Sequence, residues 1–167
     1  MRIFITGNAG SGKTTLARKL GMATGLPVIG LDRIIWQPGW KKTSKEVRMA
    51  QERVISAKEF WIVDGVSNIF QDAADIVIFL DVSRSKSFVR CMERNWRFMF
   101  QSRPELPPNC PEFLILPYLL KLIWKFPNQV RPNILAKMQA RDSGQFIVQN
   151  EHDLKVLVKY LGIDEMI

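Results

Sequence analysis

The chain has 167 residues, which is enough for one domain with a sizeable hydrophobic core and too few to require two. Its hydrophobic content of 47% and charged content of 24% are ordinary for a globular protein, and it contains no repeat or low-complexity tract. The net charge of +8 is not ordinary, and the segment 84–137, with ten basic and three acidic residues, carries +7 of it. Such a charge can serve polyphosphate, nucleic acid or an anionic surface.

The cysteines and the apolar stretches indicate a cytoplasmic protein. Cys91 and Cys110 have no C-x-x-C spacing and are too few for a four-thiolate zinc site, so a reduced compartment is expected. Met1 leads directly into an apolar run, which leaves no room for a signal peptide. The most apolar stretch, 113–126, contains a proline and two lysines and is too short to span a bilayer, so we expect no transmembrane segment.

The first predicted strand, residues 2–6, runs into a glycine-rich loop that fits the pattern G-x-x-x-x-G-K-[ST] of P-loop nucleotide-binding proteins. Its glycines allow successive backbone N–H groups to point into one concavity, and the helix that begins near Gly12 adds its positive dipole end. Lys13 can then contact the β and γ phosphates of a nucleotide, and the Thr14 hydroxyl can ligate Mg²⁺. The predicted nucleotide-binding residues of this loop are Gly7, Asn8, Ala9, Gly10, Ser11, Gly12, Lys13, Thr14 and Thr15.

The remaining elements follow from hydrophobic periodicity and capping signals. Further strands are predicted at 27–31, 60–63, 75–80 and 145–148, and helices at 13–23, 44–58, 84–100, 113–125, 132–139 and from Asn150 to Gly162. The helix 44–58 is expected to turn Val47, Ala50, Val54 and Ile55 inward. A proline-rich tract with prolines at 104, 107, 108 and 111 separates two of the helices.

Apolar strands that alternate with helices predict a three-layer α/β fold in which helices cover both faces of a five-stranded parallel sheet. In such sheets ligands bind at the carboxyl ends of the strands. Asp32, Asp64 and Asp81 all follow predicted strands, at the same edge as Gly7. The sequence therefore places the candidate site at this edge.

Several segments together resemble the adenylate-kinase-like small kinases, most closely the FlaR-like proteins that are often labelled DNA topology modulation proteins. They are GNAGSGKTT (7–15), LPVIGLD (26–32), WQPGW (36–40), WIVDG (61–65), IVIFLDV (76–82), RCMER (90–94), SRPELPPNCPE (102–112) and RPNIL (131–135). The resemblance covers nearly the whole chain. It implies a single P-loop kinase domain over residues 1–167, with ATP as phosphoryl donor and a mobile lid in the basic segment around 97–137.

The same resemblance suggests roles for the three aspartates. Asp64, followed by Gly65, is similar to the Asp-Gly of nucleotide kinases, so Thr14 and Asp64 are the predicted Mg²⁺ residues, with Asp81 as the competing candidate. Asp32 occupies the position that faces the acceptor in similar kinases, where a carboxylate can take the proton of a hydroxyl. A turn or N-cap role for Asp32 is the alternative.

Arginines in the basic segment are the predicted charge-stabilising groups. Arg90 and Arg94 are one helical turn apart, and similar kinases carry such a pair with one arginine over the adenine and one near the phosphates. Arg103 begins the proline-rich tract and is expected to reach the transition state when a lid closes. The predicted catalytic residues are therefore Lys13, Asp32, Arg94 and Arg103, while Arg131 is equally consistent with a phosphate contact or a structural role.

The acceptor is less closely defined by the sequence. Adenylate kinases follow Asp-Gly with an arginine that clamps the monophosphate, but residues 66–68 here are Val-Ser-Asn, so an uncharged hydroxyl compound is the favoured acceptor. Arg33 and Arg48 are the possible substitutes for that arginine. Trp36 and Trp40 either line an acceptor pocket or pack in the core, whereas Trp61, Trp96 and Trp124 are predicted to be packing residues.

Three alternatives stay open. The same motifs are consistent with a nucleoside monophosphate kinase. Alternatively, the basic segment could belong to a nucleotide-binding, DNA-associated regulator without kinase activity. The stretch 113–126 could also contact a membrane or a second subunit, so the chain is expected to be a monomer or a homodimer.

Overall fold

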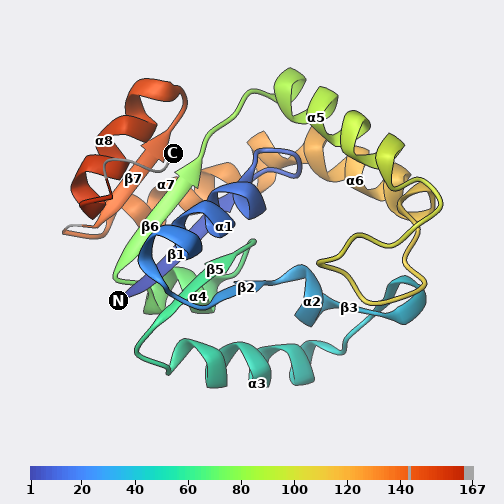
Figure 1. The fold of residues 1–167 in the computed structure, drawn as a ribbon, viewed down its shortest axis with the longest axis horizontal. Helices are drawn as coiled ribbons and strands as arrows, with labels where there is room; N and C mark the ends of the chain where they lie inside the picture. The colour runs from blue at the N-terminus through green and yellow to red at the C-terminus, as the bar shows by residue number, and fades with distance from the viewer. Residues whose placement is uncertain (143, 164–167) are drawn as a thin grey trace.

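Five parallel strands form the centre of the protein in the computed structural model, which describes residues 1–142 and 144–163 (Figure 1). The strands are β1 (Arg2–Gly7), β2 (Val28–Gly30), β5 (Trp61–Asp64), β6 (Ile76–Leu80) and β7 (Gln145–Val148). They pair in the order β2-β5-β1-β6-β7, and every neighbouring pair is parallel. The predicted α/β fold with a five-stranded parallel sheet is confirmed, and β1 delivers the glycine-rich loop to the middle of the sheet edge.

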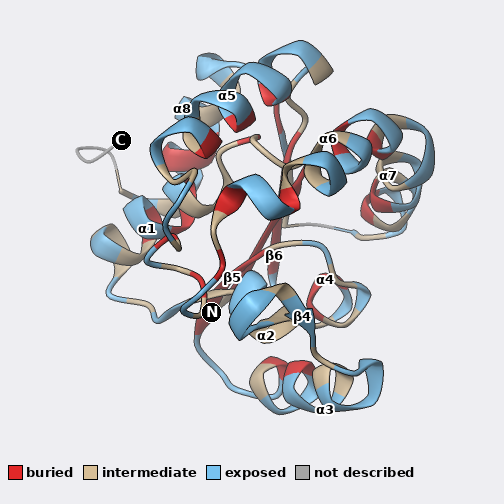
Figure 2. Ribbon diagram, turned by 90° about the vertical axis from the view of Figure 1, so that its right-hand side faces the viewer, coloured by how far each residue is buried: buried red, intermediate tan, exposed pale blue. Residues whose placement is uncertain are grey.

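Alternation along β1 divides the core into two layers of side chains. Ile3 and Ile5 face α1 (Lys13–Thr24) and α8 (Glu151–Leu161), which supply Leu16, Leu20 and Leu157 to that layer. Phe4, on the opposite side, packs with residues of α4 (Asn68–Ala73), α6 (Glu112–Gln129) and α7 (Arg131–Gln139). Because helices cover both faces, the three central strands β5, β1 and β6 are buried along nearly their whole length (Figure 2), whereas the edge strands β2 and β7 are more exposed.

Short elements follow β2 and fill the rim of the sheet edge. Helix α2 (Asp32–Ile35) leads into a two-stranded antiparallel hairpin, β3 (Trp36–Gln37) and β4 (Lys41–Lys42), which is closed by a 3₁₀ turn over Pro38–Trp40. The second strand therefore ends at Gly30, and Asp32 opens a helix rather than closing a strand. This hairpin was not predicted from the sequence.

The inward face expected for α3 (Lys45–Ser56) is confirmed only at Ile55, which is partly buried against the core, and Ala50 is exposed. Val47 and Val54 are exposed, and the side chains that become buried are Glu52 and Ser56. The reason is that α3 packs against α4 rather than on the sheet, and Glu52 accepts a hydrogen bond of 2.6 Å from the hydroxyl of Ser67, the N-cap of α4. A polar interaction with a neighbouring helix has overridden the apolar stripe.

Helix α5 (Arg84–Arg97) and α6 run side by side, joined by the proline-rich tract 98–111 (Figure 1). Trp61 is fully buried, as predicted, but Trp96 and Trp124 project from these two helices and are 76% and 68% exposed. The prediction that these two tryptophans are packing residues is therefore wrong. Within the part of the chain that the structure describes, no helix has the length and apolar character needed to cross a membrane.

Candidate active site

The glycine-rich loop is held tightly between β1 and α5. Gly10 has a φ of 77°, and a Cβ built on it would lie 2.3 Å from the backbone oxygen of Ser87 in α5. No side chain fits at that distance, and the left-handed backbone itself favours glycine. Gly12, also left-handed, is the N-cap of α1, so the loop opens directly onto the helix N-terminus as predicted.

A proline in α6 provides a second anchor for the loop. Pro127 has no N–H, so the carbonyl of Ile123, four residues earlier, is left without its normal helical partner. The side-chain amide of Asn8 donates to that carbonyl at 3.2 Å, while the Asn8 oxygen accepts from the N–H of Ala9 at 2.8 Å. Asn8 is 3% exposed, so this bridge between loop and helix is shielded from water.

Lys13, Thr14 and Asp64 meet where the loop enters α1. The Lys13 ammonium donates to the carbonyls of Gly7 and Asn8 at 3.0 and 2.7 Å, and the Thr14 hydroxyl donates to Asp64 Oδ2 at 2.7 Å. The other oxygen, Asp64 Oδ1, is buried without a hydrogen-bond partner. Burial raises the pKa of Asp64 and lowers the pKa of Lys13, which means that burial destabilises the charged form of both side chains.

This arrangement fits a Mg·nucleotide. Neither Lys13 nor Asp64 forms an ion pair within the described residues, so phosphate oxygens could contact Lys13 directly and Mg²⁺ could bind the unpartnered oxygen of Asp64. Mg²⁺ keeps several waters and takes one or two protein oxygens together with substrate phosphates. One hydroxyl and one carboxylate, side by side below a phosphate-binding loop, provide such a set.

Asp64→Asn is expected to stabilise the ligand-free protein at neutral pH while lowering Mg²⁺-dependent turnover. The folded-state pKa of Asp64 is raised, so its protonated form stabilises the fold below the unfolded-state value of about 3.9, and this contribution is lost as the pH rises through the folded pKa. The amide of the variant is neutral throughout this pH range, so the variant does not lose this stabilisation. Melting temperatures of both proteins between pH 4 and 8 should diverge as the pH rises, and equal slopes would contradict the assignment.

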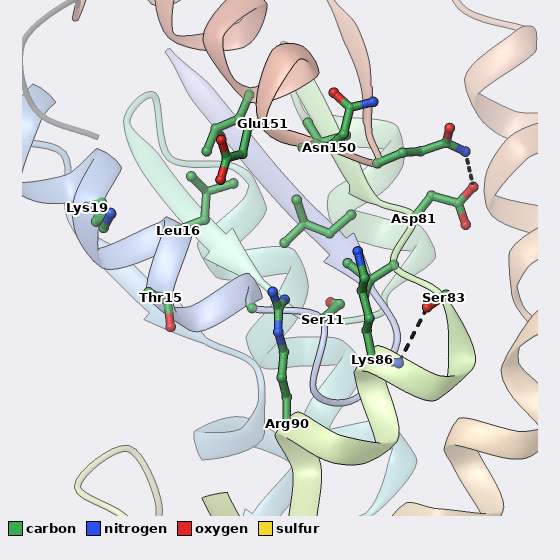
Figure 3. Close-up of a pocket in the computed structure, with 16 residues that line it drawn as sticks. Ser11, Thr15, Leu16, Lys19, Asp81, Ser83, Lys86, Arg90, Asn150 and Glu151 are labelled. Atoms are coloured by element: carbon green, nitrogen blue, oxygen red, sulfur yellow. Dashed lines mark hydrogen bonds between the residues drawn. The ribbon is translucent and has the colours of Figure 1, made fainter. Parts of the chain in front are cut away.

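A cavity of about 800 Å³ lies on one side of the loop, between α1, α5 and the start of α8 (Figure 3). Lys86 and Arg90 extend into it from α5, and Thr15 and Lys19 line it from α1. Arg90 makes no ion pair in the described residues. The volume is within the range that accommodates a nucleotide-sized ligand.

A second cavity of about 270 Å³ opens on the other side of the loop. Lys13, Asp32, Asp64, Arg94 and Arg103 all line it, so five predicted site residues that are far apart in the sequence converge here. Arg90 and Arg94, although one turn apart, therefore face different cavities. The rest of the wall is largely apolar and includes Ile35, Trp36, Trp40, Ile115, Tyr118, Leu119 and Leu122.

Glu112, which the sequence reasoning missed, organises the arginines of the second cavity. Its side chain is fully buried, is hydrogen-bonded to Arg103 Nε, and lies 3.8 Å from Arg94 Nη2. Arg103 in turn approaches Asp32, with Nη2 3.6 Å from Oδ2. Arg103 is 7% exposed and is already in the site in this structure. The sequence signal that could have led to Glu112 is the segment 102–112, which contains both Arg103 and Glu112.

The hairpin of Trp36 and Trp40 docks on the proline-rich tract. The Trp40 indole donates to the Pro111 carbonyl at 2.8 Å, and its backbone N–H lies 3.4 Å from Cys110 Sγ. Trp40 has a φ of 58°, a left-handed conformation that a large residue adopts only when its surroundings hold it. Trp36 packs edge-on against both Trp40 and Tyr118, so these aromatic side chains form one wall of the second cavity.

Asp81 is engaged away from Lys13 and Thr14. It accepts two hydrogen bonds from Arg131, at 2.9 and 2.8 Å, and one from the Gln149 amide at 2.8 Å, seen as a dashed line in Figure 3. The Arg131 guanidinium lowers the pKa of Asp81. Arg33 and Arg48 line neither cavity, and Arg48 pairs with Glu52 at 3.3 Å.

Solved structures of shikimate and deoxyadenosine kinases share this fold. No protein-family model and no curated protein sequence matches the chain. Shikimate kinase from Bacteroides thetaiotaomicron aligns at a TM-score of 0.59 and 18% identity over 97% of this chain and 98% of that one. Deoxyadenosine kinase from M. mycoides with products dCMP and dCDP aligns at 0.56 and 18% over 97% and 98%. Shikimate kinase from Acinetobacter baumannii, in complex with shikimate, aligns at 0.53 and 17% over 96% and 93%.

Proposed function

We propose that this protein is an ATP-dependent phosphotransferase that moves the γ-phosphoryl group to a hydroxyl of a small-molecule acceptor. The observation that carries the proposal is the contact of Thr14 with Asp64 beside Lys13, below a loop with a cavity on either side. One cavity suits the donor nucleotide and the other an acceptor, with the phosphate-binding loop between them. The fold shared with small-molecule kinases also supports a phosphotransferase function.

On the donor side, the backbone of Gly7 to Thr15 would hold the phosphates, with Lys13 at the β and γ groups and Arg90 against the base. Thr14 and Asp64 would hold Mg²⁺, which supplies charge neutralisation at the transferring phosphoryl group when bound. The position of Arg94 in the second cavity supports a role at the developing charge rather than at the base.

On the acceptor side, Asp32 would orient the hydroxyl and take its proton while the acceptor oxygen forms its bond to the γ-phosphorus and the bond to the β,γ-bridging oxygen breaks. The charge balance favours an uncharged acceptor. Arg94 and Arg103 share the buried Glu112, and Arg103 also approaches Asp32, so two carboxylates already offset the charge of the two guanidiniums. The aromatic wall suits an acceptor with an apolar ring or face.

We further propose that the basic segment around 97–137 acts as the lid, since it carries both Arg103 and the helix that forms the outer wall of the acceptor cavity. We also propose membership of the FlaR-like proteins, because WQPGW and the segment 102–112, two of the segments that carry the resemblance, dock on each other. We also propose a cytoplasmic location, because Cys91 and Cys110 are free thiols, as expected in a reducing compartment.

The test is ADP formation from Mg·ATP with panels of uncharged alcohols, namely nucleosides, sugars and cyclic polyols, and with nucleoside monophosphates. ADP formation that depends on one of the alcohols is expected. A monophosphate is the rival acceptor, because the second cavity is also lined by four cationic side chains, Lys13, Arg94, Arg103 and Lys125. Turnover with monophosphates alone would overturn the assignment of a hydroxyl acceptor. If no compound supports turnover and calorimetry shows no Mg·ATP binding, the phosphotransferase proposal is wrong.

A further inference from the structure

The outer surface of α5 and α6 is unusually apolar for an exposed surface. Half of the exposed large hydrophobic side chains in the described residues lie between positions 84 and 129. We call one group of these the α5–α6 face: Phe88, Val89, Met92, Trp96, Phe100, Phe113, Leu114 and Trp124. Phe100 is 80% exposed, more than either tryptophan of the face. A surface of this kind normally marks an interaction site.

Two contacts link the face across the seam between α5 with the tract that follows it and α6. Near the start of α5, the Arg84 guanidinium lies 4.6 Å from the ring centre of Trp124 on α6. At the other end, the rings of Phe100 and Phe113 are 6.1 Å apart. Side chains of the face therefore meet neighbours from the other segment at these two points.

The polarity of α5 is inverted relative to a helix that only covers a core. Its buried positions are Ser87, Cys91 and Asn95, spaced four residues apart, and the next stripe of the helix, Phe88, Met92 and Trp96, points outward. A helix that folds only against its own domain turns its large apolar residues inward. The large residues of α5 thus contribute little to the fold and suit a partner outside it.

The charges around the face favour an anionic partner. Arg84 contacts Trp124, Arg97 and Lys121 are exposed cations of the same two helices, and Glu93 is the acidic residue on the exposed side of α5. A second copy related by a two-fold axis would bring these cations against themselves. A nucleic acid would gain stacking from the aromatic rings but nothing from Val89, Met92 and Leu114, whereas aliphatic and aromatic side chains both insert at a lipid interface.

We propose that the α5–α6 face docks on an anionic lipid bilayer, with Trp96, Phe100 and Trp124 inserted at the interface and the basic side chains at the headgroups. This inference does not depend on the proposed phosphotransferase activity. It places the lipid against the outer side of α5, the helix whose inner side carries Arg90 and Arg94 into the two cavities. Helix α6 would lie in the membrane plane and would not span it.

The experiment is flotation of the purified chain with vesicles of phosphatidylcholine alone or with phosphatidylglycerol added. Binding to the anionic vesicles is expected, with a fall as salt is raised because the headgroup attraction is screened. Trp96→Ser/Trp124→Ser should lower the partition coefficient about tenfold or more. Lys121→Glu should lower it about fivefold or more at low salt. Phe60→Ser is the matched control, since Phe60 is 56% exposed and lies outside the α5–α6 face.

Circular dichroism should show that all variants melt like the wild type, since the substituted side chains are exposed. Tryptophan emission should shift to the blue with anionic vesicles, and the shift should be lost in the double tryptophan variant. Failure of the wild type to float with anionic vesicles, or unchanged binding of the double variant, would overturn the proposal. A dimer that the double variant dissociates, or binding to a labelled single-stranded oligonucleotide without vesicle binding, would assign the face to another partner.

Discussion

Lys13→Ala is expected to lower the turnover of Mg·ATP with the correct acceptor by at least about two orders of magnitude. The ammonium is held between the carbonyls of Gly7 and Asn8, at the concave side of the loop, and burial lowers its pKa. Its side chain also lines the second cavity, where the phosphoryl group would cross. Loss of one preorganised electrostatic group typically costs about 3 kcal/mol of transition-state stabilisation.

The measurement is kcat and KM for ADP formation, with Lys58→Ala as the control because Lys58 is exposed beyond α3 and lines neither cavity. The fall should appear mainly in kcat, because the lysine would interact most strongly with charge that develops during transfer. A variant with normal kcat and only a raised KM would show that Lys13 contributes to nucleotide binding alone. A variant with unchanged kinetic constants would remove it from the site.

Glu112→Ala is expected to destabilise the protein by about 3–5 kcal/mol, a fall of about 6–20 °C in melting temperature. The carboxylate is fully buried and hydrogen-bonded to Arg103, which is itself 7% exposed. Removal of the acid leaves the arginine buried without its principal counter-charge and leaves Arg94 without its ion pair. Transfer activity should fall as well, since both guanidiniums line the second cavity.

A double variant separates stability from function. Arg103→Met/Glu112→Met replaces the buried pair by apolar side chains of similar size, and such replacements are often neutral or stabilising. It should recover much of the lost melting temperature but none of the lost activity. Glu93→Ala, an exposed acid on α5, is the control and should change the melting temperature by little. Recovered activity in the double variant would mean that Arg103 does not take part in transfer.

The parts of the site that depend on local sequence could be predicted from it. The loop from Gly7 to Thr15 is specified by its glycines and by the strand and helix on either side, which are all determined over a few residues. The order of apolar strands and helices was likewise enough to predict the parallel sheet, which in turn brings Asp64 to the loop because β1 and β5 are neighbours. Capping signals gave the bounds of α8, with Asn150 and Gly162 at its two ends.

Only the tertiary structure decided the contacts between segments that are far apart in the sequence, because no local pattern links such segments. Periodicity identifies the apolar side of α3 but not the element it meets, and in the contact with α4 Val47 and Val54 stay exposed while Ile55 packs against the core. In the same way, the sequence by itself could not tell that Trp96 and Trp124 stay exposed, or that Glu112 lies buried between two arginines. A residue's neighbours along the chain fix its backbone conformation, whereas its burial, charge partners and pKa depend on residues that the fold brings from elsewhere.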